Sequence, residues 1–294
     1  MNAKNTPADN QVLAKFGPLL RLVRPRQWVK NAFVLAPLLF SGRFTEPAAI
    51  VAALLATLLF CLAASSVYII NDILDREADR QHPTKCKRPL ASGTVSLPDA
   101  LVLLVVLYGL ILLGGLIVPR VVLVIIGYLV LNLAYATRLK HMAVIDIFTV
   151  AAGFVLRVWA GALALQVPVS SWMLITTFSL ALYLTAVKRR QELVSSGSDC
   201  RQVLQKYSLE LIERYAQLSA TAALLLYCIF VMSARPQLVI SIPLVMFGLF
   251  RYWYLVDGGD GESPTEAVLG DLPLLLTVAL WTLACGYELW PAGL

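Results

Sequence analysis

Four polar residues with a fixed spacing stand where a long apolar run ends. Asn71, Asp72, Asp75 and Asp79 follow the pattern N-D-x-x-D-x-x-x-D. If this segment is helical, 100° per residue places the three aspartates within about 60° of one another on one face. Magnesium is typically held by one or two protein carboxylates, with water and substrate phosphate completing its octahedral shell. The spacing predicts a magnesium site for a diphosphate, with the three aspartates as catalytic residues and all four side chains as metal ligands.

Basic residues follow this acidic motif within a few turns. Lys85, Lys87 and Arg88 lie in the segment HPTKCKRPLASG, whose prolines and glycine predict an ordered loop of about 15 residues. Such bases are suited to bind phosphate charge that the metal does not neutralise. The alternative is a solvated loop of mixed charge, but a solvated loop has no need for carboxylates at i, i+3 and i+7 on a membrane helix.

The segment that carries the motif is one of many apolar segments. Apolar residues make up 59% of the 294 residues and charged residues 14%, and the mean hydropathy is +0.76, which is too apolar for an ordinary soluble globule. Nine runs are long enough to cross a bilayer. They are residues 28–42, 48–70, 98–118, 120–136, 144–166, 170–187, 215–233, 236–254 and 271–290. We therefore expect an all-α polytopic membrane protein, with a flexible cytoplasmic segment at residues 1–20 and one nine-helix transmembrane domain at residues 21–294.

The distribution of basic residues predicts which loops face the cytoplasm. Of the 24 lysines and arginines, 19 lie before the first predicted span, at its start (Lys30) or in the loops after the second, fourth and sixth spans. The positive-inside rule then places the N-terminus and the acidic motif in the cytoplasm. The acidic segment at residues 257–271 is expected on the outer face. The net charge of +6 follows from this topology and gives no argument for nucleic acid binding.

Several other positions have two interpretations each. Lys30 and Asn31 either anchor the first span at the interface or bind substrate phosphate. Arg157 lies inside a predicted span, where a charge is costly unless it is paired or hydrated, so a structural salt bridge and a substrate contact are equally supported. Lys188 and Arg189 either mark the cytoplasmic end of a span or complete a phosphate site.

The acidic motif and the loop after it resemble the first aspartate-rich motif of the UbiA superfamily of intramembrane prenyltransferases. Further segments are similar to one branch of that superfamily. These are RPRQWVKN at 24–31, LKHMAVID at 139–146, GFVLRVWAG at 153–161, K-R-x-x-E from residue 188, RY at 251–252 and DGG at 257–259. The resemblance extends from about residue 20 to 272 and is specific, because at least five separated motifs agree in order and spacing. It implies nine helices around a central cavity, with Mg²⁺ as the cofactor.

One departure from the superfamily pattern indicates the branch. Many members have a second motif, D-x-x-x-D, near the start of the fifth helix, whereas here Asp146 is followed four residues later by Val150. Tyr135 and Lys140 lie in that region instead. This fits the branch that moves 5-phosphoribose from phosphoribosyl diphosphate to a polyprenyl phosphate and releases diphosphate. The alternatives are transfer of a prenyl group from a prenyl diphosphate to an aromatic acceptor, and a lipid-binding or transport protein without chemistry.

The resemblance also implies the location and the partners of the site. We expect the site on the cytoplasmic side of a bacterial inner (plasma) membrane. The expected partners are phosphoribosyl diphosphate, a polyprenyl phosphate lipid and the membrane itself. The resemblance leaves open whether the protein forms homo-oligomers. No general base is expected, because the lipid phosphate is already anionic near neutral pH and needs only positioning. The expected phosphate-binding residues are Lys30, Asn31, Lys85, Arg88, Tyr135, Lys140, Arg157, Lys188 and Arg189.

Overall fold

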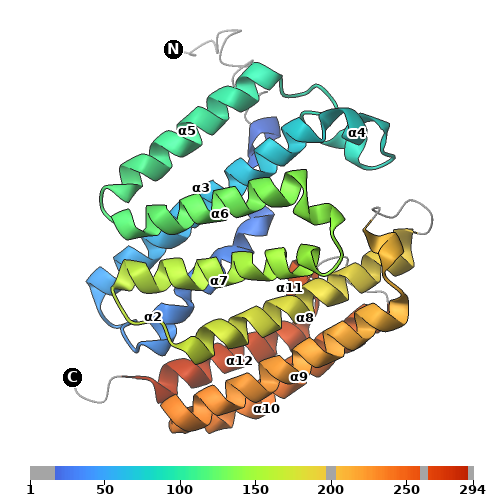
Figure 1. The fold of residues 1–294 in the computed structure, drawn as a ribbon. Helices are drawn as coiled ribbons and strands as arrows, with labels where there is room; N and C mark the ends of the chain where they lie inside the picture. Colours follow the sequence, from blue (N-terminus) through green and yellow to red (C-terminus); the bar gives the residue numbers. More distant parts are fainter. Residues whose placement is uncertain (1–16, 197–202, 259–263, 291–294) are drawn as a thin grey trace, which may run out of the picture.

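The computed structural model describes residues 17–196, 203–258 and 264–290, which form helices and connecting loops (Figure 1). Most of the predicted N-terminal segment, residues 1–16, lies outside the described residues, and residues 17–23 are helical. The long helices are α3 (Pro47–Leu74), α5 (Leu97–Gly115), α6 (Pro119–Thr137), α7 (Ile145–Leu165), α8 (Ser171–Ser196), α9 (Leu209–Ala234), α10 (Ile242–Asp257) and α12 (Leu272–Glu288). The shorter α-helices are α2 (Ala36–Phe40), α4 (Arg76–Gln81) and α11 (Pro264–Gly270). The 3-10 helices are η1 (Pro25–Leu35), η2 (Lys85–Lys87), η3 (Leu139–His141), η5 (Leu204–Lys206) and η6 (Pro236–Ser241).

The predicted all-helical membrane architecture is confirmed, whereas the count of nine spans is approximate. In the part of the chain that the structure describes, seven helical segments are long and apolar enough to cross a membrane, and η6 joined to α10 is the last of them. The apolar helix α12 is shorter, with 17 residues. The first predicted span, residues 28–42, is no single long α-helix, because it consists of η1 followed by the five residues of α2.

This first span is long enough to cross a membrane because a 3-10 helix rises more per residue than an α-helix. The 11 residues of η1 rise about 22 Å at about 2.0 Å per residue, and α2 adds about 7 Å, so together they match a hydrocarbon core of roughly 30 Å. A 3-10 helix repeats every three residues, and Asn31, Val34 and Pro37 accordingly form one buried column, while Val29 is exposed. Gly161 on α7 permits the close approach of η1, because a side chain there would collide with the Val34 carbonyl.

α3, α7 and α8 are the most buried of the long spans. In the most apolar part of each span, 50% of α3 and 44% of α7 and of α8 is buried inside the protein, compared with 22% for α5 and for α6. α3 packs against η1, α5, α6 and α7, and it does so through small residues such as Ala56 and Ala63, which are fully buried and let helices approach closely. The acidic motif at the end of α3 is therefore surrounded by other elements.

The end of α10 lies at the same end of the bundle as the C-terminal end of α8. Arg190, near the end of α8, forms ion pairs with Glu213 on α9 at 2.6 Å and with Asp257, the last residue of α10, at 2.8 Å. Figure 1 shows that this end of α8 is also the end of the bundle that carries α4. The prediction that residues 257–271 face the side opposite to the acidic motif is therefore wrong for its described part. The reason is that the chain crosses the bundle twice after the end of α8, once in α9 and once in η6 and α10, so the end of α10 returns to the side of the end of α8. Residues 259–263 of this segment lie outside the described residues.

Candidate active site

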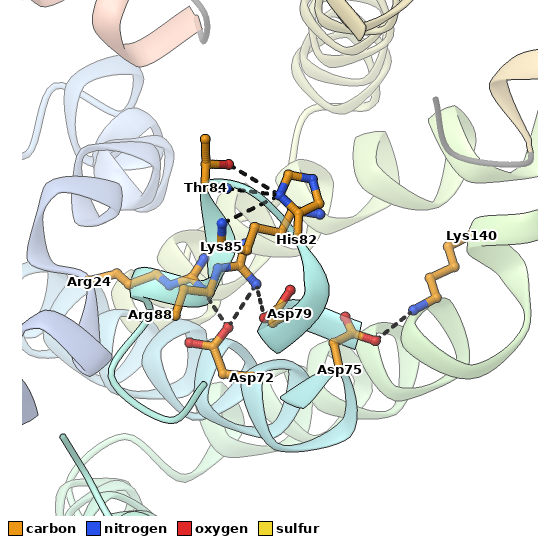
Figure 2. Close-up of polar contacts among 9 residues, drawn as sticks. All are labelled: Arg24, Asp72, Asp75, Asp79, His82, Thr84, Lys85, Arg88 and Lys140. Atoms are coloured by element: carbon orange, nitrogen blue, oxygen red, sulfur yellow. Dashed lines mark hydrogen bonds and ion pairs between the residues drawn. The ribbon is translucent and has the colours of Figure 1, made fainter. Parts of the chain in front are cut away.

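The acidic motif spans a break between two helices. α3 ends just before Asp75, whose φ of −91° and ψ of 4° interrupt the helix, and α4 follows. The prediction that one continuous helix face carries all three aspartates is therefore wrong. In Figure 2, Asp72 and Asp79 share a contact with Arg88, whereas Asp75 contacts Lys140. The motif thus splits into a carboxylate pair and one separate carboxylate.

One arginine joins the pair. Arg88 Nη1 lies 3.2 Å from Asp72 Oδ1 and 2.6 Å from Asp79 Oδ2. The two aspartates are only 2% and 4% exposed. A single cationic nitrogen therefore lies between two buried carboxylates, and carboxylate oxygens are also the ligands that a hard divalent ion prefers. In the described part of the chain no three acidic, histidine or cysteine residues are grouped around a metal position, so water and substrate phosphate would have to complete the shell. Asn71 lies half-buried beside the pair on α3.

Arg24 is a site residue that the sequence analysis did not assign. Its Nη2 lies 2.5 Å from Asp72 Oδ1, and its guanidinium lies over the ring of Tyr68, 5.0 Å from the ring centroid. Its backbone is left-handed, with φ 54° and ψ 60°, which is uncommon for a residue with a side chain. The signal was present in RPRQWVKN, but a base at a membrane edge is equally well explained as an interfacial anchor.

The loop after α4 is folded back over the motif by hydrogen bonds to His82. Its Nδ1 accepts from the backbone N–H of Thr84 at 3.3 Å and of Lys85 at 3.4 Å, as Figure 2 shows. Farther along, Arg80 donates to the carbonyl of Ala91 at 3.3 Å. These bonds close the loop and place Arg88, which lies between them in sequence, beside the two buried carboxylates.

A second polar cluster lies where α6, α7 and α8 meet. Asp146 is fully buried, and its Oδ2 accepts from Arg189 Nε at 3.0 Å while its Oδ1 accepts from the Tyr207 hydroxyl at 2.8 Å. Arg189 also donates to the Tyr135 hydroxyl at 2.9 Å and to Glu192 at 2.7 Å. Tyr135 and Arg189, two of the expected phosphate-binding residues, are therefore bonded to each other inside a protein network.

Tyr207 has no signal in the sequence, because it stands alone in a polar stretch before α9. Burial raises the pKa of its hydroxyl above the ordinary tyrosine value, and the hydrogen bond to Asp146 acts in the same direction. The hydroxyl therefore stays protonated and available as a donor. The two clusters are connected through the segment between α6 and α7, where Lys140 Nζ lies 3.3 Å from Asp75 Oδ1.

Arg157 and Asn31 lie deeper in the bundle and contact each other. Arg157 Nε donates to Asn31 Oδ1 at 2.8 Å, Nη1 to the Gly153 carbonyl at 2.8 Å and Nη2 to the Tyr128 hydroxyl at 3.2 Å. Aromatic faces, including that of Phe60 at 5.4 Å, surround the guanidinium. Among the described residues no carboxylate lies within ion-pair distance of Arg157, so the salt-bridge interpretation of this residue is wrong there. Its charge is instead balanced by neutral acceptors and ring faces.

The remaining predicted bases keep part of their surface open. Lys30 on η1 and Lys85 on η2 are half-exposed, and Lys188 Nζ lies 3.9 Å from the Glu192 carboxylate at the edge of the second cluster. These three lysines therefore retain access to a ligand that approaches from the aqueous side.

Two surface hollows lie at the other end of the bundle. One, of about 440 Å³, is lined by Ala49, Ala52, Leu165 and neighbouring residues, and the other, of about 340 Å³, by Phe40, Met173 and neighbouring residues. Ala49 is near the start of α3, about 35 Å along the helix axis from Asp72 at 1.5 Å per residue. The hollows are therefore separate from the carboxylates.

Comparison with known proteins identifies the family. Residues 32–283 match the UbiA prenyltransferase family. A decaprenyl-phosphate phosphoribosyltransferase of Mycobacterium tuberculosis is 36% identical over 282 residues, which cover 91% of this chain and 93% of the relative. One of Corynebacterium glutamicum is 35% identical and covers 95% and 88%. The structure of a UbiA homologue from Archaeoglobus fulgidus bound to GPP and Mg²⁺ has the same fold, with a TM-score of 0.70, 22% identity and coverage of 93% and 99%. The chain therefore belongs to the UbiA prenyltransferase family.

Proposed function

We propose that the protein transfers 5-phosphoribose from phosphoribosyl diphosphate to a polyprenyl phosphate. The observation that carries this proposal is the identity of 35–36% with decaprenyl-phosphate phosphoribosyltransferases over at least nine-tenths of the chain. The second cluster supports it. Its two carboxylates, Asp146 and Glu192, are both bonded to Arg189, and Asp146 also accepts from Tyr207, so Arg189 already neutralises the carboxylates that a second metal-bound diphosphate of a prenyl donor would need.

In the proposed reaction an oxygen of the lipid phosphate forms a bond to C1 of the ribose. The bond between C1 and the diphosphate breaks, and its electron pair leaves with the diphosphate. Because the lipid phosphate is already anionic, no residue has to remove a proton. The chain has to position the two substrates and stabilise the charge that develops on the diphosphate.

Magnesium fits the carboxylate pair of the acidic motif. Asp72 and Asp79 are buried and already face one cationic nitrogen of Arg88. Hard carboxylate oxygens are the ligands that Mg²⁺ prefers, and it retains positions for water and phosphate. When bound there, Mg²⁺ would act as a Lewis acid toward the diphosphate. Asp75 and Asn71 are proposed to assist from the edge of the pair.

Five half-exposed bases are proposed to bind substrate phosphates: Lys30, Lys85, Arg88, Lys140 and Lys188. A charged hydrogen bond to phosphate is stronger than a neutral one, and phosphoribosyl diphosphate brings a remote phosphate on C5 that needs its own cation. The other four predicted phosphate ligands, Asn31, Tyr135, Arg157 and Arg189, are bonded to one another in two pairs, Asn31 with Arg157 and Tyr135 with Arg189. We propose that they shape the walls of the site behind these bases.

We place this site at the cytoplasmic side of a bacterial plasma membrane. The support is the positive-inside rule, since 19 of the 24 bases lie before the first span, at its start or in the loops on this side, together with the bacterial origin of the relatives. In single-cysteine variants, Lys87→Cys and Gly258→Cys should react with an impermeant thiol reagent from the cytoplasmic side, and Glu46→Cys from outside. Reaction of the first two from opposite sides would contradict both the fold and this placement.

The choice of donor is tested with the purified protein in lipid nanodiscs. We expect label from phosphoribosyl diphosphate labelled in its ribose to enter the lipid fraction when a polyprenyl phosphate and Mg²⁺ are supplied. A prenyl diphosphate with an aromatic acceptor should give no product. The reverse pattern would establish the prenyltransferase alternative and would leave only the fold and the metal site standing.

A further inference from the structure

The residue before α7 has a strained backbone. Val144 has φ 68° and ψ −47°, a region close to that of a rare and strained three-residue turn. A β-branched residue at positive φ is a genuine outlier, because its Cβ crowds the backbone. Such a conformation persists only where the surroundings hold it, and it is typical of functional sites. Contacts with neighbouring residues therefore have to hold Val144 at positive φ, because the valine side chain disfavours that backbone conformation.

Tyr207 supplies this support. Its hydroxyl accepts from the backbone N–H of Val144 at 2.5 Å and donates to Asp146 Oδ1 at 2.8 Å. Its ring is 6% exposed and lies edge-on to the ring of Tyr215, with centroids 6.4 Å apart. The preceding residue, Lys206, contacts the carbonyl of His141 at 3.5 Å. The end of η5 thus holds the connection between η3 and α7 at two points.

This connection carries a residue of the candidate site on each side of the strain. Four residues before Val144, Lys140 reaches Asp75 of the acidic motif. Two residues after it, Asp146 enters the second cluster. The positive φ at Val144 allows the side chain of Lys140 to face the carboxylates and that of Asp146 to face the interior. If Val144 relaxed to an ordinary negative φ, the chain would rotate at this point and Lys140 would leave the acidic motif.

We infer that Tyr207 is a positioning residue for donor binding, which acts by holding Val144 in its strained conformation and thereby keeping Lys140 beside the acidic motif. This inference rests on the proposed function, because it takes Lys140 to be a phosphate-binding residue. Tyr207 itself contacts no substrate. Its effect should therefore be found in the affinity for phosphoribosyl diphosphate and should pass through Lys140.

Tyr207→Phe tests the inference, because it keeps the buried ring and removes only the hydroxyl. We expect KM for phosphoribosyl diphosphate to rise about tenfold, as for one lost hydrogen bond to a charged site, with kcat changed less than about twofold. Tyr215→Phe is the matched control. It removes a neighbouring hydroxyl that forms no hydrogen bond with any residue described in the structure, and KM should stay unchanged.

Two further variants separate positioning from a general structural defect. Lys140→Met should raise KM by itself, and adding Tyr207→Phe should raise it no further, because both changes remove the same contact. Val144→Gly should restore KM in the Tyr207→Phe background, because glycine adopts positive φ without strain. Losses that multiply in the double variant, or no rescue by glycine, would overturn the inference.

Hydrogen exchange in the substrate-free protein separates this inference from the proposed function. Tyr207→Phe should speed exchange of the amides of residues 139–146, and that of Val144 most, whereas Tyr215→Phe should not. If wild-type protein does not use phosphoribosyl diphosphate, the proposed function fails while this measurement still decides whether Tyr207 holds the turn. Unchanged exchange at Val144 would overturn the inference even in a protein with the proposed activity.

Discussion

The two polar clusters at this end of the bundle each centre on a buried aspartate, but they neutralise it in different ways. Asp72 is paired with Arg24 and Arg88, whose side chains are 29% and 31% exposed and come from a connection and a loop. Asp146 is paired with Arg189, which is 4% exposed and belongs to the long helix α8. An arginine that reaches solvent can be hydrated when it leaves its partner, whereas a buried one cannot. The ion pairs of Asp72 can thus be replaced by other ligands, whereas the ion pair of Asp146 is a fixed part of the fold.

The largest effect should be the loss of stability caused by breaking the ion pair between Arg189 and Asp146. Arg189→Gln leaves the fully buried Asp146 carboxylate without its cation, and removal of one partner of a buried pair typically costs about 3–5 kcal/mol. We expect a loss of this size in the free energy of unfolding, measured by denaturant titration in detergent. Lys188→Gln is the control, since its half-exposed pair at 3.9 Å should contribute less than about 1 kcal/mol. Equal losses in the two variants would remove the distinction between buried and exposed cations.

The next largest effect should be on turnover in the first cluster. Asp72→Asn preserves the shape of the side chain but removes the charge that fits a metal, and we expect kcat/KM to fall at least about a hundredfold with saturating Mg²⁺. The fold should survive, because Arg24 and Arg88 can be hydrated. Glu77→Gln, on the exposed side of α4, is the control and should keep normal activity. Activity above a few per cent in Asp72→Asn would exclude the metal assignment.

A smaller effect should show that the cations of the first cluster are exchangeable. Arg24→Gln removes one competitor for the Asp72 carboxylate, so Mn²⁺ should bind more tightly, by about tenfold if one charged hydrogen bond no longer has to be displaced. The measurement is electron paramagnetic resonance of free Mn²⁺ without substrates. Arg26→Gln is the control, because Arg26 has the same charge in the same turn but is exposed. Weaker binding in Arg24→Gln would show that Arg24 supports the metal site instead of competing for it.

The sequence was sufficient for those features that depend on local pattern. Apolar length predicted the membrane helices, and the family motifs predicted the family. The metal site that the row of acids predicted stays a prediction. The prediction that Asp75 shares a face with its neighbours failed because periodicity assigns a face only while the helix continues. The sequence around Asp75 contains no proline or glycine that would indicate the end of a helix.

Contacts between distant segments could not be predicted. Tyr207 and Asp146 are 61 residues apart in sequence, and they meet because the segment before α9 lies against the start of α7. A salt bridge was one of the two interpretations of Arg157, but the structure surrounds its guanidinium with an amide, a carbonyl, a hydroxyl and ring faces. Those partners come from four separate elements, and no single motif contains them.

The 3-10 form of η1 fixes a spacing between two regions of the site. Asn31, which contacts the buried Arg157, follows Arg24, which contacts the acidic motif, by seven positions in the sequence. With three residues per turn, insertion of one residue would rotate everything beyond it by about 120°. The buried column that begins at Asn31 would then turn toward lipid, while Arg24 could keep its carboxylate. We therefore expect natural relatives of this chain to vary the residues on the exposed column of η1 freely and to preserve its length, so that insertions and deletions are found before Arg24 and not within the helix.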